Sequence, residues 1–211
     1  MSSYNTISGQ RIQRIEALSD GLFSIAMTIL VFDLKDPVSN RIQSNAELLV
    51  SLKILLPQLL TYFLSFMTLG IFWTGYSTQF NYIEKYDRNL NWYSLFFLLF
   101  VSLIPFSTNV LSNHINNQVS IGIYWLNIFA MGNMLYIHWR YARRNNFLSL
   151  SGKAQETVDK AIRSRVFTAQ SLYALGASLC FINTYLSIAF IIGVQLNYAL
   201  GIITPKVQKP L

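Results

Sequence analysis

The chain has 211 residues, of which 53% are apolar, 15% aromatic and only 12% charged. Soluble domains carry about 25% charged residues, so this chain has too little polar surface to cover a globule of its size. The composition argues against a soluble domain, a disordered chain, a disulfide scaffold and a nucleic-acid-binding module. The net charge of +7 is instead typical of the basic loops of a membrane protein. We therefore predict an all-α integral membrane protein.

The apolar stretches predict six transmembrane helices in a single domain, 1–211. A helix needs roughly 20 residues to cross the hydrocarbon core, and the first four candidates cover about residues 17–34, 54–76, 92–111 and 119–139. The last uncharged stretch, 166–203, is too long for one crossing. The polar group Asn183-Thr184-Tyr185 predicts a turn there, which gives helices at about 166–182 and 185–203. Residues 145–165 predict a cytosolic helix leading into the fifth span, with Ser151 as its cap.

Charge placement supports six spans. With both termini on one side, 13 of the 16 basic residues fall on that side, and only Lys35, Arg41 and Lys53 fall on the other. The positive-inside rule then places both termini in the cytoplasm. A five-span arrangement separates the basic clusters less cleanly. Six aromatic residues are expected at headgroup depth on the cytoplasmic side: Trp73, Tyr76, Trp92, Tyr93, Trp139 and Tyr141.

The beginning of the first span is unusually polar, because it carries Arg14, Ser19 and Asp20 within two helical turns. A carboxylate at a membrane boundary favours a partner, and Arg14 is six residues from Asp20 rather than the three or four that suit pairing within a helix. Asp20 is therefore expected to contact a neighbouring helix, while Arg14 extends to the interface or pairs with another subunit. The alternative is that the acidic residues only cap the helix N-terminus.

The pattern Arg14-x-x-x-Leu18-Ser19-Asp20, followed by an apolar span, resembles the R-x-x-x-F-S-D signature of the transmembrane protein 175 family of potassium channels. Leu18 replaces the usual Phe. The size and the six spans with cytosolic termini are similar to the bacterial members that have a single six-span repeat. A T-V-G-Y-G filter loop is absent from the sequence, as the resemblance implies.

The resemblance implies a homotetramer whose first spans line one central pore. By position, the constriction begins at Ile25, and Ile25, Thr28, Ile29 and Phe32 share one helical face. These residues are expected to line the pore, with the Thr28 hydroxyl contributing to cation preference, and the function implied is a passive, potassium-permeable cation channel with modest selectivity over sodium. The network Arg14, Ser19 and Asp20 would hold the cytoplasmic helix ends together. The alternative for the four-residue stripe is ordinary packing against lipid or the protein core.

Other classes of function remain as alternatives. A secondary transporter with a pocket among several spans is the second interpretation, and a membrane scaffold is the third. An enzyme is not expected, because His114 and His138 fall on opposite sides of the membrane and no nucleophile or nucleotide motif occurs. Apart from transient potassium in the pore, neither a metal nor a cofactor is expected. The basic loop after the fourth span is primarily a topology determinant, and secondarily a surface for anionic membrane lipids. The expected location is a prokaryotic cell membrane.

Overall fold

The computed structural model describes residues 12–34 and 44–201. Within these ranges the chain is helical apart from short turns and one isolated β-bridge between Ile83 and Leu148. The elements, in chain order, are α2 (Ile12–Ile29), η1 (Leu30–Asp33), α3 (Asn45–Ile54), α4 (Leu56–Phe80), α5 (Arg88–Ser102), α6 (Ile104–Asn113), α7 (Gln118–Arg144), α8 (Gly152–Ser178), η2 (Leu179–Phe181) and α9 (Thr184–Leu200). The basic residues Arg11, Lys35, Arg41, Lys206 and Lys209, and the end of the expected sixth span, lie outside the described ranges.

Polar residues in the loops determine where several helices begin. The Asp87 carboxylate accepts a hydrogen bond from the Leu90 amide at 2.8 Å and caps α5. The Asn183 side chain accepts from the Tyr185 and Leu186 amides at 2.8 and 3.2 Å and caps α9. Such caps satisfy amides that have no partner within the helix. The turn predicted near Asn183 is therefore present, and α8 and α9 form a hairpin across it.

Two pairs of consecutive helices are each separated by a single residue, shortly before a proline. The backbone breaks at Leu55, between α3 and α4, and at Leu103, between α5 and α6. Pro57 and Pro105 then occupy the first turn of the next helix, where their missing amide proton costs no hydrogen bond. Each proline thus coincides with an interruption of the helix, between α3 and α4 and between α5 and α6.

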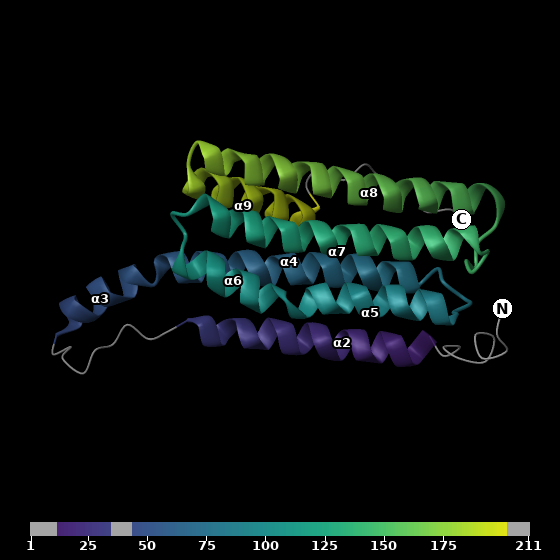
Figure 1. The fold of residues 1–211 in the computed structure, drawn as a ribbon, viewed down its shortest axis with the longest axis horizontal. Helices are drawn as coiled ribbons and strands as arrows, with labels where there is room; N and C mark the ends of the chain where they lie inside the picture. Colours follow the sequence, from purple (N-terminus) through teal and green to yellow (C-terminus); the bar gives the residue numbers. More distant parts are fainter. Residues whose placement is uncertain (1–11, 35–43, 202–211) are drawn as a thin grey trace.

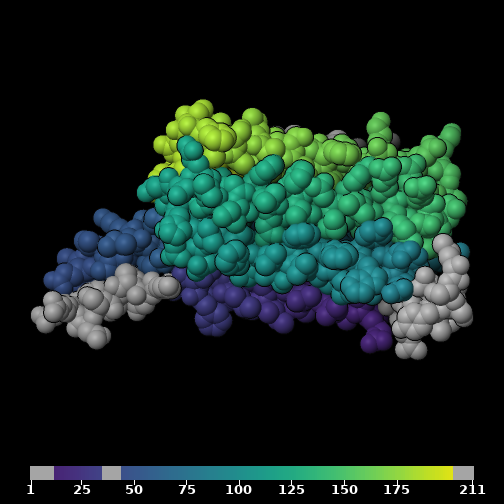
Figure 2. Space-filling view, viewed as in Figure 1, coloured from purple at the N-terminus to yellow at the C-terminus, as the bar shows by residue number. Residues whose placement is uncertain are grey.

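The helices pack side by side along one long axis, as Figure 1 shows. α2 lies at one edge of the body and contacts α4, α5 and α6, whereas α8 and α9 lie at the opposite edge, against α7 and α4. α3 buries no residue and projects beyond the packed body (Figure 2). The outer surface of the bundle is therefore formed by α2 at one edge and by the α8–α9 hairpin at the other.

Aromatic side chains fill the centre between α2, α4 and α5. The ring centroid of Phe97 lies 6.0 Å from that of Phe23, 6.3 Å from that of Phe72 and 4.5 Å from that of Tyr76. Phe97 and Tyr76 are fully buried. Offset aromatic pairs of this kind add specific contacts to apolar burial, so they fix how α2 packs against the rest of the bundle.

Four described helical segments are long and apolar enough to cross a membrane: Ile12–Asp33, Leu56–Phe80, Arg88–Asn113 and Gln118–Arg144. α8 has 27 residues, and its charged residues all precede Val166. α9 is apolar but has only 17 residues. The described fold is therefore all-helical with four candidate spans. The helices of the last hairpin, α8 and α9, are not among these four.

The expectation that all six boundary aromatics lie at the membrane surface is wrong for two of them. Tyr76 is 1% exposed and Trp139 is not exposed at all, because Tyr76 packs against Phe97 and His138 and Trp139 donates to the buried Asp159. Trp73 and Trp92, in contrast, are 42% and 48% exposed. An aromatic residue near a helix end therefore faces outward only when the rotation of the helix allows it.

Candidate functional site

One face of α2 packs against the chain's own core. Its buried residues follow helical spacing: Ile15, Ser19, Phe23, Ala26 and Leu30. A stripe with spacings of three and four is what a helix requires to bury one side continuously. Ser19 is among these residues, 2% exposed. The buried side of α2 is thus the side that carries the serine of the polar motif.

The opposite face of α2 carries the four residues expected to line a pore. Ile25, Ile29 and Phe32 are 55%, 43% and 78% exposed, and Thr28 is also exposed. Packing within the chain's own core is therefore excluded for this stripe. Phe32 lies in η1, where the helix tightens to a 3₁₀ turn, so its register with Ile25 differs from that of an ideal α-helix. A row of large apolar side chains is left for lipid, water or another subunit to contact.

Thr28 supplies a polar atom to this otherwise apolar stripe. Its hydroxyl donates to the carbonyl oxygen of Ile25 at 2.9 Å. With its proton held by the helix backbone, Oγ1 keeps its lone pairs for an acceptor role on the exposed face. An oxygen presented in this way is a weak ligand for a partly dehydrated cation.

Asp20 contacts a neighbouring helix, as the sequence predicted. The indole Nε1 of Trp73, in α4, donates to Oδ1 of Asp20 at 2.9 Å. Arg14 is exposed and makes no ion pair with any residue in the described ranges. The structure therefore joins Asp20 to α4, and it does not bring Asp20 and Arg14 together within one chain.

The segment formed by α2 and η1 is also attached to the bundle at its C-terminal end. Asn109 Nδ2, in α6, donates to Oδ1 of Asp33 at 2.7 Å. No partner of Asp33 was predicted from the sequence. Its position directly after the uncharged run 21–32 is the feature that indicates the need for one. Two side-chain hydrogen bonds, one near each end, therefore hold the exposed stripe of α2 and η1 in a fixed orientation relative to α4 and α6.

A buried polar network joins four helices inside the bundle. Thr108 of α6 donates to Ser65 of α4 at 2.7 Å, and the Tyr124 hydroxyl of α7 lies 2.9 Å from Thr68 Oγ1. Gln195 of α9 donates to the same Thr68 oxygen at 2.7 Å. Gln195 and the hydroxyls of Ser65, Thr68, Thr108 and Tyr124 thus bond to one another across the helix contacts. Hydrogen bonds between membrane helices usually hold the helices together.

The two histidines do not form a site together. His114 is exposed in the turn before α7, whereas His138 is fully buried and its Nδ1 lies 2.8 Å from Oε1 of Gln79. The His138 ring packs against Tyr76, Phe80 and Tyr86, so it is part of the core. Within the part of the chain that the structure describes, no group of three or more potential metal ligands occurs.

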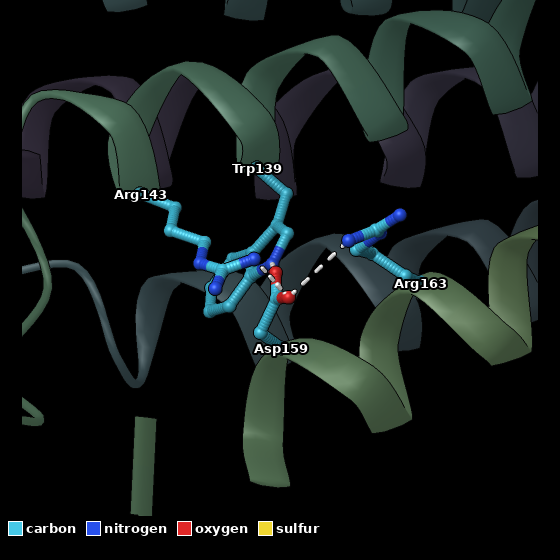
Figure 3. A network of polar contacts seen from close by, with 4 residues as sticks. All are labelled: Trp139, Arg143, Asp159 and Arg163. Carbon is cyan, nitrogen blue, oxygen red and sulfur yellow. Dashed lines mark hydrogen bonds and ion pairs between the residues drawn. The ribbon is translucent and has the colours of Figure 1, made fainter. Parts of the chain in front are cut away.

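A second polar cluster connects α7 to the charged half of α8 (Figure 3). Asp159 is 5% exposed, and its carboxylate accepts a hydrogen bond from Trp139 Nε1 at 3.0 Å and pairs with the Arg143 guanidinium. Arg163, one turn further along α8, lies 3.6 Å away. A carboxylate this deeply buried requires such partners. Asp159 therefore fixes how the charged part of α8 packs on α7.

These features define the class of protein. An all-helical bundle with four apolar helices of membrane-spanning length is a multi-pass membrane protein. The family described as "Endosomal/lysosomal potassium channel TMEM175" matches residues 14–105, a range that begins at Arg14 of the polar motif.

Individual relatives extend the similarity beyond that range. A potassium channel of Streptomyces collinus is 28% identical over 180 residues, covering 83% of this chain and 85% of that protein. The rat endosomal/lysosomal proton channel TMEM175 is 31% identical over 98 residues, covering 44% of this chain and 20% of that protein. A solved structure, the lysosomal potassium-selective channel TMEM175 homologue from Chamaesiphon minutus, is 26% identical with a TM-score of 0.76 over 90% of this chain and 96% of that one. The chain is thus similar to TMEM175 channels in both sequence and fold, which confirms the resemblance.

Proposed function

We propose that this protein is a passive, potassium-permeable cation channel. The observation that carries the proposal is the similarity in sequence and fold, over 90% of this chain, to a structure described as a potassium-selective channel. Conduction down a gradient requires neither a reaction nor a cofactor. The exposed apolar face of α2 supports this function, because a pore formed between subunits needs a face that is not used for packing within one chain.

In the proposed assembly, four subunits place α2 around a central axis. Ile25, Ile29 and Phe32 then form apolar constrictions, and rings of Thr28 hydroxyls lie between them. Apolar rings of this kind close by dewetting or admit a partly dehydrated ion when wide enough. Potassium sheds its hydration shell more easily than sodium, so weak oxygen ligands give modest selectivity for potassium.

The proposed topology has six spans with both termini in the cytoplasm of a cell membrane. α8 enters the membrane at Val166, where its charged residues end, and α9 completes the hairpin. The positions of 13 of the 16 basic residues support this orientation. At the cytoplasmic end, Asp20 contacts Trp73 within the subunit, and Arg14 is free of described ion pairs and extends toward the neighbouring subunit. Ser19 lies on the buried side of the same helix, so in this proposal it anchors α2 within the subunit while Asp20 and Arg14 act at its surface.

A substitution at Ile25 tests the pore assignment. Purified protein in liposomes, loaded with potassium, is compared for efflux per reconstituted tetramer, with valinomycin giving the total releasable ion. Ile25→Ser is expected to raise efflux severalfold, because a small polar side chain keeps the constriction wet. The control is Leu175→Ser, which changes an apolar residue of similar exposure, 52%, on the opposite edge of the bundle. Equal efflux from the wild type and Ile25→Ser would overturn the assignment.

A further inference from the structure

A small crevice lies between α4, α7, α8 and α9, on the side of the bundle away from α2. Its volume is about 70 Å³. The apolar part of its lining includes Ile71, Gly75, Leu135, Val166 and Ala169. Phe72 and Tyr173 also line it, but no residue of α2 does. The crevice is therefore separate from the face proposed to conduct ions.

Arg165 lines the same crevice, at the boundary between charged and uncharged sequence. It is the last charged residue before the uncharged run 166–203. Its guanidinium carbon lies 5.6 Å from the centroid of the Tyr198 ring, and it pairs with no carboxylate in the described ranges. Arg163, two residues earlier, faces Asp159 instead. Arg165 thus presents a positive charge that the described acidic residues leave uncompensated.

The inner part of the crevice contains a polar side chain with an unused acceptor. Gln170 donates from Nε2 to the carbonyl oxygen of Ile128 at 3.4 Å, while its Oε1 is buried without a partner among the described residues. Gly132 allows this arrangement, because a Cβ at that position would lie 1.6 Å from Gln170 Nε2. The absence of a side chain at Gly132 therefore keeps the amide in the crevice wall.

We propose that this crevice binds an anionic phospholipid, with the phosphate at Arg165 and part of one acyl chain among the apolar residues. The proposal rests on the six-span topology of the proposed function, which puts Arg165 at headgroup depth. Basic pockets between membrane helices are suited to anionic headgroups, and Arg binds phosphate oxygens in a bidentate manner. The volume accepts only a short length of chain, so the rest of the lipid lies along the outside of the bundle.

Native mass spectrometry of the purified full chain tests the proposal without measuring any current. Delipidated protein is titrated with phosphatidylglycerol, with phosphatidylcholine of the same acyl chains, and with glycerol 3-phosphate. Phosphatidylglycerol is expected to bind more tightly than the other two. Arg165→Gln should weaken its binding roughly fivefold, and Ala169→Phe should weaken it by filling the crevice while the arginine remains. The matched control is Arg144→Gln, which removes an exposed charge that does not line the crevice.

Three results would overturn the proposal. The first is unchanged phosphatidylglycerol binding by both Arg165→Gln and Ala169→Phe. The second is an equal loss of binding in Arg144→Gln, which would indicate general attraction by the basic surface. The third is equally tight binding of glycerol 3-phosphate, which would indicate a soluble phosphate site. A protein that binds the lipid as expected but conducts no potassium would refute the proposed channel and leave this site standing.

Discussion

Trp73 Nε1 donates a hydrogen bond to Asp20 Oδ1 at 2.9 Å, and this contact links the polar motif of α2 to α4. Asp20 is exposed and Trp73 is 42% exposed within the single chain. The bond therefore lies on the outer surface of the single chain, where the proposed tetramer would place a contact between subunits. It gives the carboxylate at the start of this apolar helix a partner on α4, which fits the proposed role of positioning the helix.

Removing either partner of this bond should lower stability without changing ion preference. Trp73→Phe keeps the ring and removes the donor, and Asp20→Ala removes the acceptor. Each is expected to cost about 1 kcal/mol, or roughly 2–4 °C in thermal midpoint, and Asp20→Ala should also reduce the tetramer fraction in size-exclusion chromatography. Trp92→Phe is the control, because Trp92 is similarly exposed and its ring contacts Phe96 in a tilted arrangement. An Asp20→Ala tetramer of normal stability would contradict the proposed role.

The Thr28 hydroxyl should determine part of the preference for potassium. Thr28→Val keeps the shape of the side chain and removes the oxygen, so the potassium-to-sodium permeability ratio is expected to fall toward one. Thr28→Ser keeps the oxygen and should retain most of the ratio. Thr74→Val is the matched control, since Thr74 is an exposed threonine of α4 that also donates to its own helix, to the Gly70 carbonyl at 2.8 Å. A ratio unchanged in Thr28→Val would remove Thr28 from the conduction path.

The buried carboxylate of Asp159 should be essential for packing α8 on α7. Asp159→Asn leaves Arg143 without its charge partner and weakens the acceptor for Trp139, so we expect a loss of about 2 kcal/mol in stability. The loss is smaller than for a fully buried pair, because the arginine side chains are 37% and 47% exposed. Glu156→Gln, an exposed acid one turn earlier, should leave the thermal midpoint unchanged. Equal midpoints for the two variants would show that the cluster contributes nothing.

The close contact between α8 and α9 depends on Gly176. A Cβ at this position would lie 2.7 Å from Ile191 Cγ1 and 3.0 Å from Phe190 Cδ1, so Gly176→Ala forces the helices apart. Overpacking of this kind typically costs about 1–3 kcal/mol, measurable as a lower thermal midpoint. In Gly193→Ala, within α9, a Cβ meets nothing within 4 Å, and helix propensity favours alanine. That variant should be neutral or slightly stabilising, and a loss as large as in Gly176→Ala would contradict the packing argument.

The sequence was sufficient to locate the four long apolar helices and the last hairpin, but not to show how each helix is rotated. Hydropathy located the apolar segments, and Asn183 marked the turn of the last hairpin, because its side chain caps a helix. Rotation is harder to predict, because in a membrane the lipid-facing surface is as apolar as the core. Along α2 and η1, for example, Ile25 and Phe32 are exposed, while the equally apolar Phe23 and the polar Ser19 are both buried.

The candidate site could be predicted only in part, for a related reason. The expected contact of Asp20 with another helix was correct, because a carboxylate at that depth needs a partner. The identity of that partner depends on tertiary packing, and the burial of Trp139 and His138 depends on the neighbours of α7. The pore-facing role of Ile25, Thr28, Ile29 and Phe32 stays a prediction, since it depends on contacts between subunits.

The central claim is tested most directly by the reversal potential of purified protein in a planar bilayer, with potassium chloride on one side and sodium chloride on the other. A channel of the proposed kind should give unitary currents that reverse at a potential shifted toward the potassium equilibrium potential. Absence of current, combined with saturable solute uptake by the same preparation in liposomes, would contradict the account and indicate a transporter.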